Sequence, residues 1–195
     1  MNACHMAART VRKISFGALL ITLWFVFGLK GASQAPEKEA IPGVQSYTRV
    51  EANIACGGTI APEAFPELKR RGFKAVINLR QPTERNANVE GEGEAVRAAG
   101  LTYINLPFYP GTPDAATWVE PFLKAVADPS NLPVYIHSIR AHRAAGLLLI
   151  KRALVDGWSI EKAMAEADAV ALADRSAGAE LTRKFSLEYI NAHSR

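Results

Sequence analysis

The chain has 195 residues, of which 49% are apolar and 22% charged, so it can form one globular domain with a sizeable core and an appendage. Residues 1–35 contain four Lys or Arg residues and no Asp or Glu. The remaining residues are therefore neutral, because 19 of the 23 basic residues face 19 acidic ones. No basic stripe with interleaved aromatic residues is present, so nucleic acid is not expected as a partner.

The first thirty residues have the pattern of a targeting segment. Three basic residues precede the uncharged run 14–29, whose length lies between a signal-peptide apolar region and a membrane span. A cleavage-site spacing ends at Ala35, but Pro36 weakens it. We therefore expect residues 1–30 to be a retained anchor or a cleaved signal peptide rather than a buried core helix. The domain would then be exported across, or anchored in, the cytoplasmic membrane on its periplasmic side.

The rest of the chain divides into a short linker and one domain. Residues 31–43 are rich in small residues, proline and charge, which indicates a linker, and the domain is expected at 44–195. Cys56 is the only cysteine after the leader, so this part cannot form an internal disulfide. We expect its thiol to be buried rather than reactive.

Extended and helical patterns alternate through the domain. In chain order we expect one or two strands in 49–58, a helix in 59–72 with Thr59 near its N-cap, a strand at 74–79, a short helix at 93–99, a strand at 101–106, a helix in 114–128, a strand at 132–137, a helix at 143–157, a helix from Ser159 as N-cap, and a last helix at 179–190. This alternation predicts an α/β domain whose mostly parallel central sheet is flanked by helices.

The segment from Ser138 to Arg143 would lie at the carboxyl edge of that sheet, directly after the strand that ends at His137. A tight strand-to-helix loop turns backbone N–H groups inward and adds the positive end of a helix dipole. Arg143 could hold two oxygens with its planar fork. The sequence therefore predicts a site for phosphate or another oxyanion.

The stretch "VYIHSIRAHRAAG", 134–146, resembles the signature of the cysteine-dependent protein tyrosine and dual-specificity phosphatases. Their pattern is His-Cys, five residues, Arg and then Ser or Thr, with a glycine in the loop. His137 matches the histidine and Arg143 the arginine, and Ser138 falls on the nucleophile position. The stretch "NIACGGTIAPEAFPELKRRGFKAVINLR" is similar to a small bacterial branch of this superfamily, which includes domains fused to β-lactamase-like hydrolases.

The resemblance covers about residues 47–175 and implies the phosphatase fold, a phosphorylated or other anionic ligand, and no cofactor or metal. It implies a phosphate-binding loop, with His137 in support, made of Ser138, Ile139, Arg140, Ala141, His142 and Arg143. Ala141 stands where the family has the loop glycine. Arg80, which closes "VINLR", could line the pocket rim or form a salt bridge.

The catalytic parts depart from the family pattern. A serine hydroxyl stays protonated where the same surroundings would ionise a cysteine, so Ser138 would need a base. His137 should face the opposite side of the strand, and the sequence shows no partner for His142. Ala144 replaces the hydroxyl residue after the arginine. Asp114, 24 residues before Ser138, could be the general acid or only a first-turn helix residue.

These departures predict a catalytically impaired pseudophosphatase whose loop still binds an oxyanion. One alternative is an active phosphomonoester hydrolase that uses Ser138 with Asp114 as acid. Another is a structural or interaction module whose pocket is vestigial, in which Arg143 would be held in a salt bridge.

Overall fold

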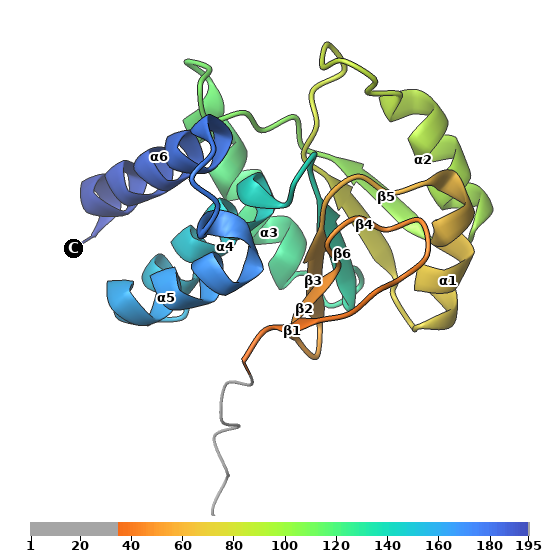
Figure 1. Cartoon of the computed structure of the whole chain (residues 1–195), viewed down its shortest axis with the longest axis horizontal. Helices are drawn as coiled ribbons and strands as arrows, with labels where there is room; N and C mark the ends of the chain where they lie inside the picture. The colour runs from red at the N-terminus through yellow and green to blue at the C-terminus, as the bar shows by residue number, and fades with distance from the viewer. Residues whose placement is uncertain (1–34, 195) are drawn as a thin grey trace, which may run out of the picture. The chain divides into compact units, whose positions relative to one another are not determined.

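Six short segments form one sheet, and the three that are buried along their whole length are mostly apolar (Figure 1). The computed structural model describes residues 35–194. The strands are β1 (Glu37–Lys38), β2 (Thr48–Glu51), β3 (Ile54–Gly57), β4 (Ala75–Asn78), β5 (Thr102–Asn105) and β6 (Val134–His137). In space their order is β1-β2-β3-β6-β4-β5. The pairs β1–β2 and β2–β3 are antiparallel and the other three pairs are parallel. The predicted α/β domain with a mostly parallel sheet is confirmed.

Helices cover both faces of the sheet because neighbouring residues of the buried strands point to opposite sides. Val76 and Tyr135 pack toward α1 and α2, whereas Ile77, Val134 and Ile136 pack toward α3, α4, α5 and α6. The helices are α1 (Phe65–Arg70), α2 (Val89–Ala98), α3 (Val119–Ala127), α4 (His142–Leu154), α5 (Ile160–Ala167) and α6 (Ala177–His193). The shorter turns are η1 (Pro62–Ala64), η2 (Ala115–Trp118) and the π-helical η3 (Asp168–Leu172).

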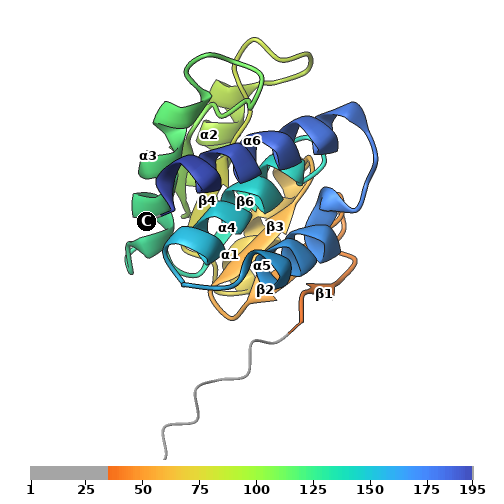
Figure 2. The same cartoon turned by 90° about the vertical axis from the view of Figure 1, so that its left-hand side faces the viewer.

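The helix that follows the predicted loop is the central element of its layer. Figure 2 shows α4 between the sheet and α6, and α4 is buried along most of its length, which explains its nearly continuous apolar sequence. Gly146 lets α6 approach closely, because a Cβ at this position would overlap the Thr182 side chain. The Ser186 hydroxyl also donates a 3.0 Å hydrogen bond to the Gly146 carbonyl. This packing fixes where both helices begin.

Two predicted helix starts are wrong, and one predicted cap is confirmed. Thr59 does not cap α1, because its hydroxyl donates to Gln45 Oε1 at 3.0 Å and a 3-10 turn at Pro62–Ala64 precedes the helix. The helix expected at 93–99 begins four residues earlier, where Asn88 Oδ1 accepts from the Gly91 N–H at 3.1 Å. Side-chain capping by Asn88 thus starts the helix ahead of its two glycines, Gly91 and Gly93. Ser159 caps α5 as predicted.

The expected leader, residues 1–30, lies outside the described residues, and the expected boundaries at 31–43 and 44–195 stay predictions. Within the expected linker, Glu37 and Lys38 pair with β2, and Ile41 is buried in the core. The predicted export to, or anchoring in, a membrane is wrong. Over residues 35–194, no helix combines the length and the apolar character that crossing a membrane requires.

Candidate functional site

The segment Ser138–Ala141 forms the predicted strand-to-helix loop at the carboxyl edge of the sheet. Its backbone is tied to the end of β3: the Thr59 N–H donates to the Ile139 carbonyl at 3.2 Å, and Gly58 and Arg140 form an isolated β-bridge. Ala141 then adopts a left-handed conformation, with φ 63° and ψ −4°, and α4 begins at the next residue. The chain therefore turns sharply where the family has its loop glycine.

Ala141 combines backbone strain with burial, and the two nearly cancel. A left-handed alanine costs about 1–2 kcal/mol. Its buried methyl contributes about 0.8 kcal/mol, and glycine loses about 0.5–1 kcal/mol more conformational freedom on folding. We therefore expect Ala141→Gly to change the free energy of unfolding, measured in urea, by less than about 1 kcal/mol.

The matched control for this prediction is Ala144→Gly, the same chemical change at a buried position inside α4. It relieves no strain and should cost about 2 kcal/mol, the sum of the lost methyl and the helix propensity of glycine. An Ala141→Gly loss as large as the Ala144→Gly loss would contradict the strain at Ala141.

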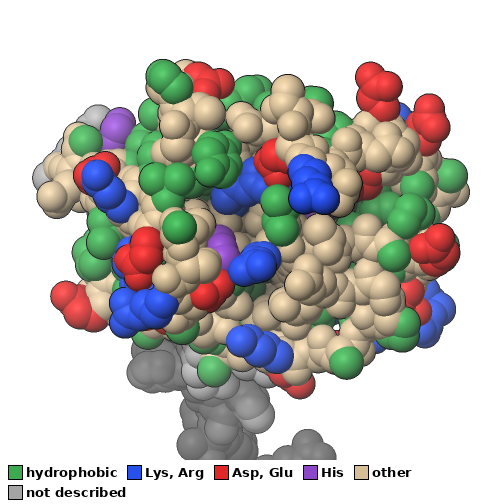
Figure 3. All heavy atoms as spheres, turned by 45° about the horizontal axis from the view of Figure 1, so that its top comes forward, with side chains coloured by type: hydrophobic (Ala, Val, Ile, Leu, Met, Phe, Trp, Pro, Cys, Tyr) green, Lys and Arg blue, Asp and Glu red, His purple; other side chains and the backbone are tan. Residues whose placement is uncertain are grey.

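The loop opens on a cavity of about 350 Å³. Ser138, Arg140 and Arg143 line one wall, and the exposed Tyr109 and Ile139 lie at its rim. The opposite wall is the start of α6, from Ser176 to Gly178, together with Thr182. Figure 3 shows basic side chains and a histidine gathered on this face of the molecule.

Two helix N-termini border this cavity, and the sequence predicted only one of them. The first residues of both α4 and α6 lie at the cavity, and neither helix has a side-chain cap on its first N–H groups. Each N-terminus carries partial positive charge and unsatisfied N–H groups, which favour an anion. The last helix was predicted to begin at residue 179, and the sequence indicated no role for it in the site.

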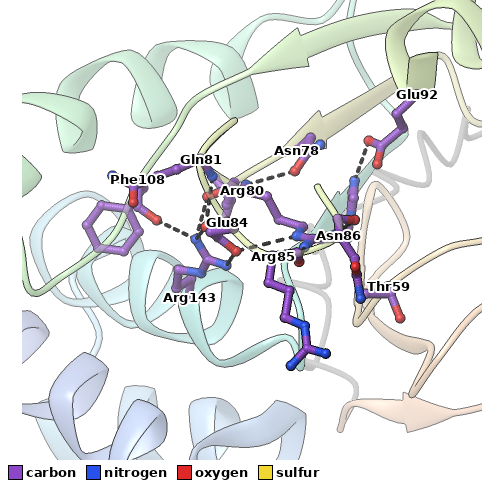
Figure 4. Close-up of polar contacts among 12 residues, drawn as sticks. Thr59, Asn78, Arg80, Gln81, Glu84, Arg85, Asn86, Glu92, Phe108 and Arg143 are labelled. Carbon is purple, nitrogen blue, oxygen red and sulfur yellow. Dashed lines mark hydrogen bonds and ion pairs between the residues drawn. The ribbon is translucent and has the colours of Figure 1, made fainter. Parts of the chain in front are cut away.

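Arg143 is buried and firmly held (Figure 4). Its Nη1 donates to the carbonyls of Leu79 at 2.8 Å and Phe108 at 2.9 Å, and to Glu84 Oε1 at 2.6 Å. Its Nη2 donates to Glu84 Oε2 at 2.9 Å. Within residues 35–194, no hydrogen bond joins its Nε to another residue. The guanidinium thus keeps an open edge, formed by Nε and the second Nη2 hydrogen.

Glu84 is the site residue that the sequence analysis missed. It lies in the loop between β4 and α2 and accepts hydrogen bonds from Arg143 on one side and from Arg80 Nε, at 3.4 Å, on the other (Figure 4). Burial raises the pKa of the Glu84 carboxyl, but hydrogen bonds from Arg143 and the Gln81 N–H outweigh it, so the pKa lies below its ordinary value. Glu84 is therefore ionised and neutralises Arg143.

Arg80 belongs to this buried network and does not line the cavity. Its Nη1 and Nη2 donate to the carbonyls of Asn86 at 3.2 Å and Arg85 at 2.8 Å. Of the two roles considered for Arg80, the structure shows the salt-bridged one, with Glu84.

The spacing of the loop corrects one step of the sequence comparison. Four residues, 139–142, separate Ser138 from Arg143, whereas the family pattern has five. In an ungapped register Ala144 would therefore take the arginine position. The side chain of Arg143 nevertheless lines the same cavity as Ser138, because it projects from the first turn of α4. Arg143 therefore shares a cavity with Ser138, although the residue count between them differs from the family pattern.

Ser138 has no base beside it among the described hydrogen bonds. His137 lies on the side of α2, where its Nε2 contacts Glu92 Oε1 at 2.8 Å and its ring stacks on Tyr135. It therefore does not face the cavity.

His142 does line the cavity and has the carboxylate partner that the sequence did not reveal, with His142 Nε2 lying 2.9 Å from Asp174 Oδ2. Burial lowers the pKa of His142 despite this partner, so its imidazole is neutral at pH 7. No hydrogen bond joins His142 to Ser138 within the described residues.

The remaining catalytic candidates lie away from the reacting position. Asp114 precedes η2 and is exposed, and its Oδ2 accepts from Trp118 Nε1 at 3.3 Å; it does not line the cavity. Hydrogen bonds from Thr112 and Trp118 lower the pKa of Asp114, so at neutral pH the carboxyl is ionised and carries no proton to donate. Ala144 is buried in the core. Cys56 is buried too, and burial raises the pKa of its thiol.

Residues 37–186 match a family model described as a DSP-PTPase phosphatase fused to NAD+ kinase. The chain belongs to this phosphatase family. The match spans most of the chain and includes both the loop and Glu84. The tyrosine and dual-specificity phosphatase-like character predicted from the sequence is confirmed.

Curated relatives of this DSP-PTPase domain match over a short stretch. An 83-residue segment is 31% identical to a protein described as probable NAD kinase 2, chloroplastic, from Oryza sativa subsp. japonica, and 28% identical to chloroplastic NAD kinase 2 from Arabidopsis thaliana. That segment is 42% of this chain but only 8% of each relative.

Solved structures share the fold of this DSP-PTPase domain. A DUF442 phosphatase-family protein from Shewanella putrefaciens CN-32 has a TM-score of 0.63 at 21% identity, over 78% of this chain and 94% of that chain. The catalytic core of the PP-IP phosphatase Siw14 from S. cerevisiae, in complex with citrate, has a TM-score of 0.60 at 22% identity, over 77% and 88%. A Cys-to-Ser variant of TpbA from P. aeruginosa, in complex with pTyr, has a TM-score of 0.56 at 16% identity, over 80% and 90%.

Proposed function

We propose that this phosphatase-family domain binds a phosphorylated or similar anionic ligand in its loop cavity and hydrolyses it poorly or not at all. The backbone amides of residues 139–143, the N-terminus of α6 and the open edge of Arg143 would hold the anion. The observation that carries the proposal is that edge: Arg143 lines the cavity, its Nε has no acceptor among the described residues, and Glu84 fixes its two Nη atoms. An arginine held in this way is already oriented to bind two oxygens.

Three features of the chain support weak hydrolysis. Ser138 lacks a hydrogen-bonded base among the described residues, so its hydroxyl would attack phosphorus as a poor nucleophile. Ala144 supplies no hydroxyl to assist the second step. Asp114 is exposed and bonded to Trp118, away from the cavity. The groups that would make and break bonds are absent or misplaced, while the groups that hold an anion remain.

The neighbours support the class of ligand. Siw14 binds citrate and the TpbA variant binds pTyr in their structures, and both ligands are anionic. Tyr109 and Ile139 at the rim would contact an apolar or aromatic group next to the phosphate.

A second candidate function is favoured by the Arg143–Glu84 ion pair. A buried pair of this kind also fits a structural or interaction module whose pocket is vestigial, because the arginine charge is already neutralised. The two functions differ in one measurable property, which is whether the cavity takes up an oxyanion.

Vanadate or phosphate binding, measured by calorimetry, tests the proposal. We expect binding by the native chain and a loss of about 10- to 100-fold in Arg143→Ala, because a hydrogen bond to a charged group is worth about 1.5–3 kcal/mol. Arg143→Lys keeps the charge and so the partner of Glu84, but loses the planar fork, and should also bind more weakly.

Arg97→Ala, which removes an exposed arginine on α2 away from the cavity, is the matched control and should bind like the native chain. Urea unfolding of each variant identifies any that fails to fold. Binding that is unchanged in Arg143→Ala, or no binding by the native chain, would favour the vestigial module instead.

A further inference from the structure

A second cavity, of about 260 Å³, adjoins the loop cavity. The two cavities share Arg140 and His142 as walls, so these side chains stand between them. Lys38, from β1, and Gln45 line the far side of the second cavity, and η3 closes it. A ligand seated in the loop cavity could therefore extend past Arg140 into this second space.

The second cavity has a positive balance of charge. Lys38 and Arg140 form no ion pair within residues 35–194. Of the two acids that line it, Asp168 accepts from Arg183 at 2.7 Å and is neutralised by it. Asp174 keeps its charge, because the imidazole of His142, 2.9 Å away, is neutral. The lining therefore keeps two cations against one uncompensated carboxylate next to the oxyanion loop, and this net positive charge favours a second negative group.

The backbone around this cavity is unusual as well. Ser46 has φ 51°, a left-handed conformation that a residue with a side chain adopts at a cost. The wall from Asp168 to Leu172 is a π-helical turn, a form that occurs mostly as single turns and often at functional sites. Asp174 joins the two cavities, because it accepts from the Ser176 N–H at 2.9 Å and also contacts His142. The start of α6 and the wall of the second cavity are thus held as one unit.

We propose that the ligand carries two anionic groups, of which the first is a phosphate held at Arg143 and the second is held by Lys38 and Arg140. The inference rests on the proposed function, because the first group must occupy the loop cavity. It narrows the ligand to a small molecule with two phosphates, or with one phosphate and one carboxylate. Lys38 then acts as a specificity residue, since it lines only the second cavity and would add affinity only for the second group, whereas Arg140 borders both cavities.

The experiment compares ligands that carry one anionic group with ligands of the same length that carry two. Alkylphosphonates of increasing chain length are titrated into the full chain by calorimetry, beside bisphosphonates and carboxyalkylphosphonates of the same lengths. We expect at least one chain length at which a two-headed ligand binds about tenfold more tightly than its single-headed counterpart. The bisphosphonate and the carboxyalkyl series distinguish a phosphate from a carboxylate as the second group.

Lys38→Gln tests whether Lys38 supplies the higher affinity for two-headed ligands. Lys38 is exposed and does not line the loop cavity, so the variant should bind single-headed phosphonates like the native chain and lose most of the two-headed advantage. Lys74→Gln is the matched control, because Lys74 directly precedes the first residue of β4 and lines neither cavity, so the variant should change neither affinity.

Each outcome decides between defined alternatives. The inference is overturned if no chain length exceeds the statistical advantage of about two that equivalent ends confer, or if Lys38→Gln weakens both ligand classes equally. If single-headed phosphonates do not bind at all, the proposed function fails, and the second anionic site fails with it.

Discussion

Glu84→Ala lowers the free energy of unfolding by about 3–5 kcal/mol, the cost of removing one partner from a buried ion pair. Glu84 supplies two of the acceptors of Arg143, at 2.6 and 2.9 Å, and also contacts Arg80. Without its carboxylate, two buried guanidinium groups keep only backbone carbonyls as partners. The measurement is equilibrium unfolding in urea, followed by circular dichroism.

Two further variants make this result specific. Glu84→Gln keeps the shape of the side chain and one acceptor oxygen, so it should lower the free energy of unfolding by less than Glu84→Ala does. Glu67→Ala removes a carboxylate from partly exposed ion pairs with Arg70 and Arg71 and should lose far less stability. Equal losses in Glu84→Ala and Glu67→Ala would show that the buried pair has no special role.

The effect of Glu84 also depends on pH in a defined direction. The pKa of Glu84 is lower in the folded chain than its ordinary value, because hydrogen bonds from Arg143 and Gln81 outweigh burial. A carboxyl with a depressed folded pKa stabilises the fold above the ordinary Glu pKa, and this contribution is lost as the pH falls through the folded value. The difference in stability between the native chain and Glu84→Ala should therefore be full at pH 7 and shrink in acid.

Much of the fold could be predicted from local patterns. The buried strands β4 and β6 are short apolar runs, and the amphipathic or apolar helices follow at regular intervals, so alternation alone indicates the parallel sheet. The position of the loop then follows from topology, because Ser138 comes directly after a strand. These elements depend on contacts between residues close in sequence, or on a burial pattern that every residue of the element shares.

The parts of the site that the sequence did not reveal depend on contacts between distant residues. Glu84 is one of several carboxylates in a polar segment, and only the fold brings it to Arg143, 59 residues later. The N-terminus of α6 reaches the cavity because Gly146 permits close packing of α4 and α6. The same packing brings Asp174, which precedes α6, to His142 at the start of α4. No local pattern distinguishes these residues from solvent-exposed neighbours.

The spacing of the loop is a different kind of discrepancy. Comparison with the family pattern placed Arg143 at the arginine by residue type, although the loop has one residue fewer. The left-handed Ala141 turns the chain directly into α4, so the side chain of Arg143 reaches the cavity from the first turn of the helix. The residue type of Arg143 predicted that it lines the cavity. The left-handed backbone at Ala141 explains how it does so from a loop that is one residue shorter.

Ser138→Cys should convert an anion-binding loop into one that reacts rapidly with one substrate molecule and then turns over slowly. The amides of the loop, two helix N-termini and Arg143 would lower the pKa of a thiol at this position and produce a thiolate. That thiolate would attack the phosphorus of p-nitrophenyl phosphate and form an S–P bond as p-nitrophenolate leaves. This leaving group departs without a proton, so the distance of Asp114 from the cavity would not prevent the step.

The second step should be slow in the same variant. Water must attack the phosphocysteine and release phosphate while the thiolate leaves, and Ala144 provides no hydroxyl to assist that departure. The intermediate should therefore accumulate, which is the origin of burst kinetics.

The time course of p-nitrophenolate release, recorded for the native chain and for Ser138→Cys, tests the central claim most directly. We expect no burst and no turnover above background from the native chain. Ser138→Cys should release a burst of about one p-nitrophenolate per protein, followed by a slow steady rate. Turnover by the native chain that Ser138→Ala abolishes, or a Ser138→Cys variant that binds vanadate yet shows no burst, would contradict an anion-holding loop that has lost its nucleophile.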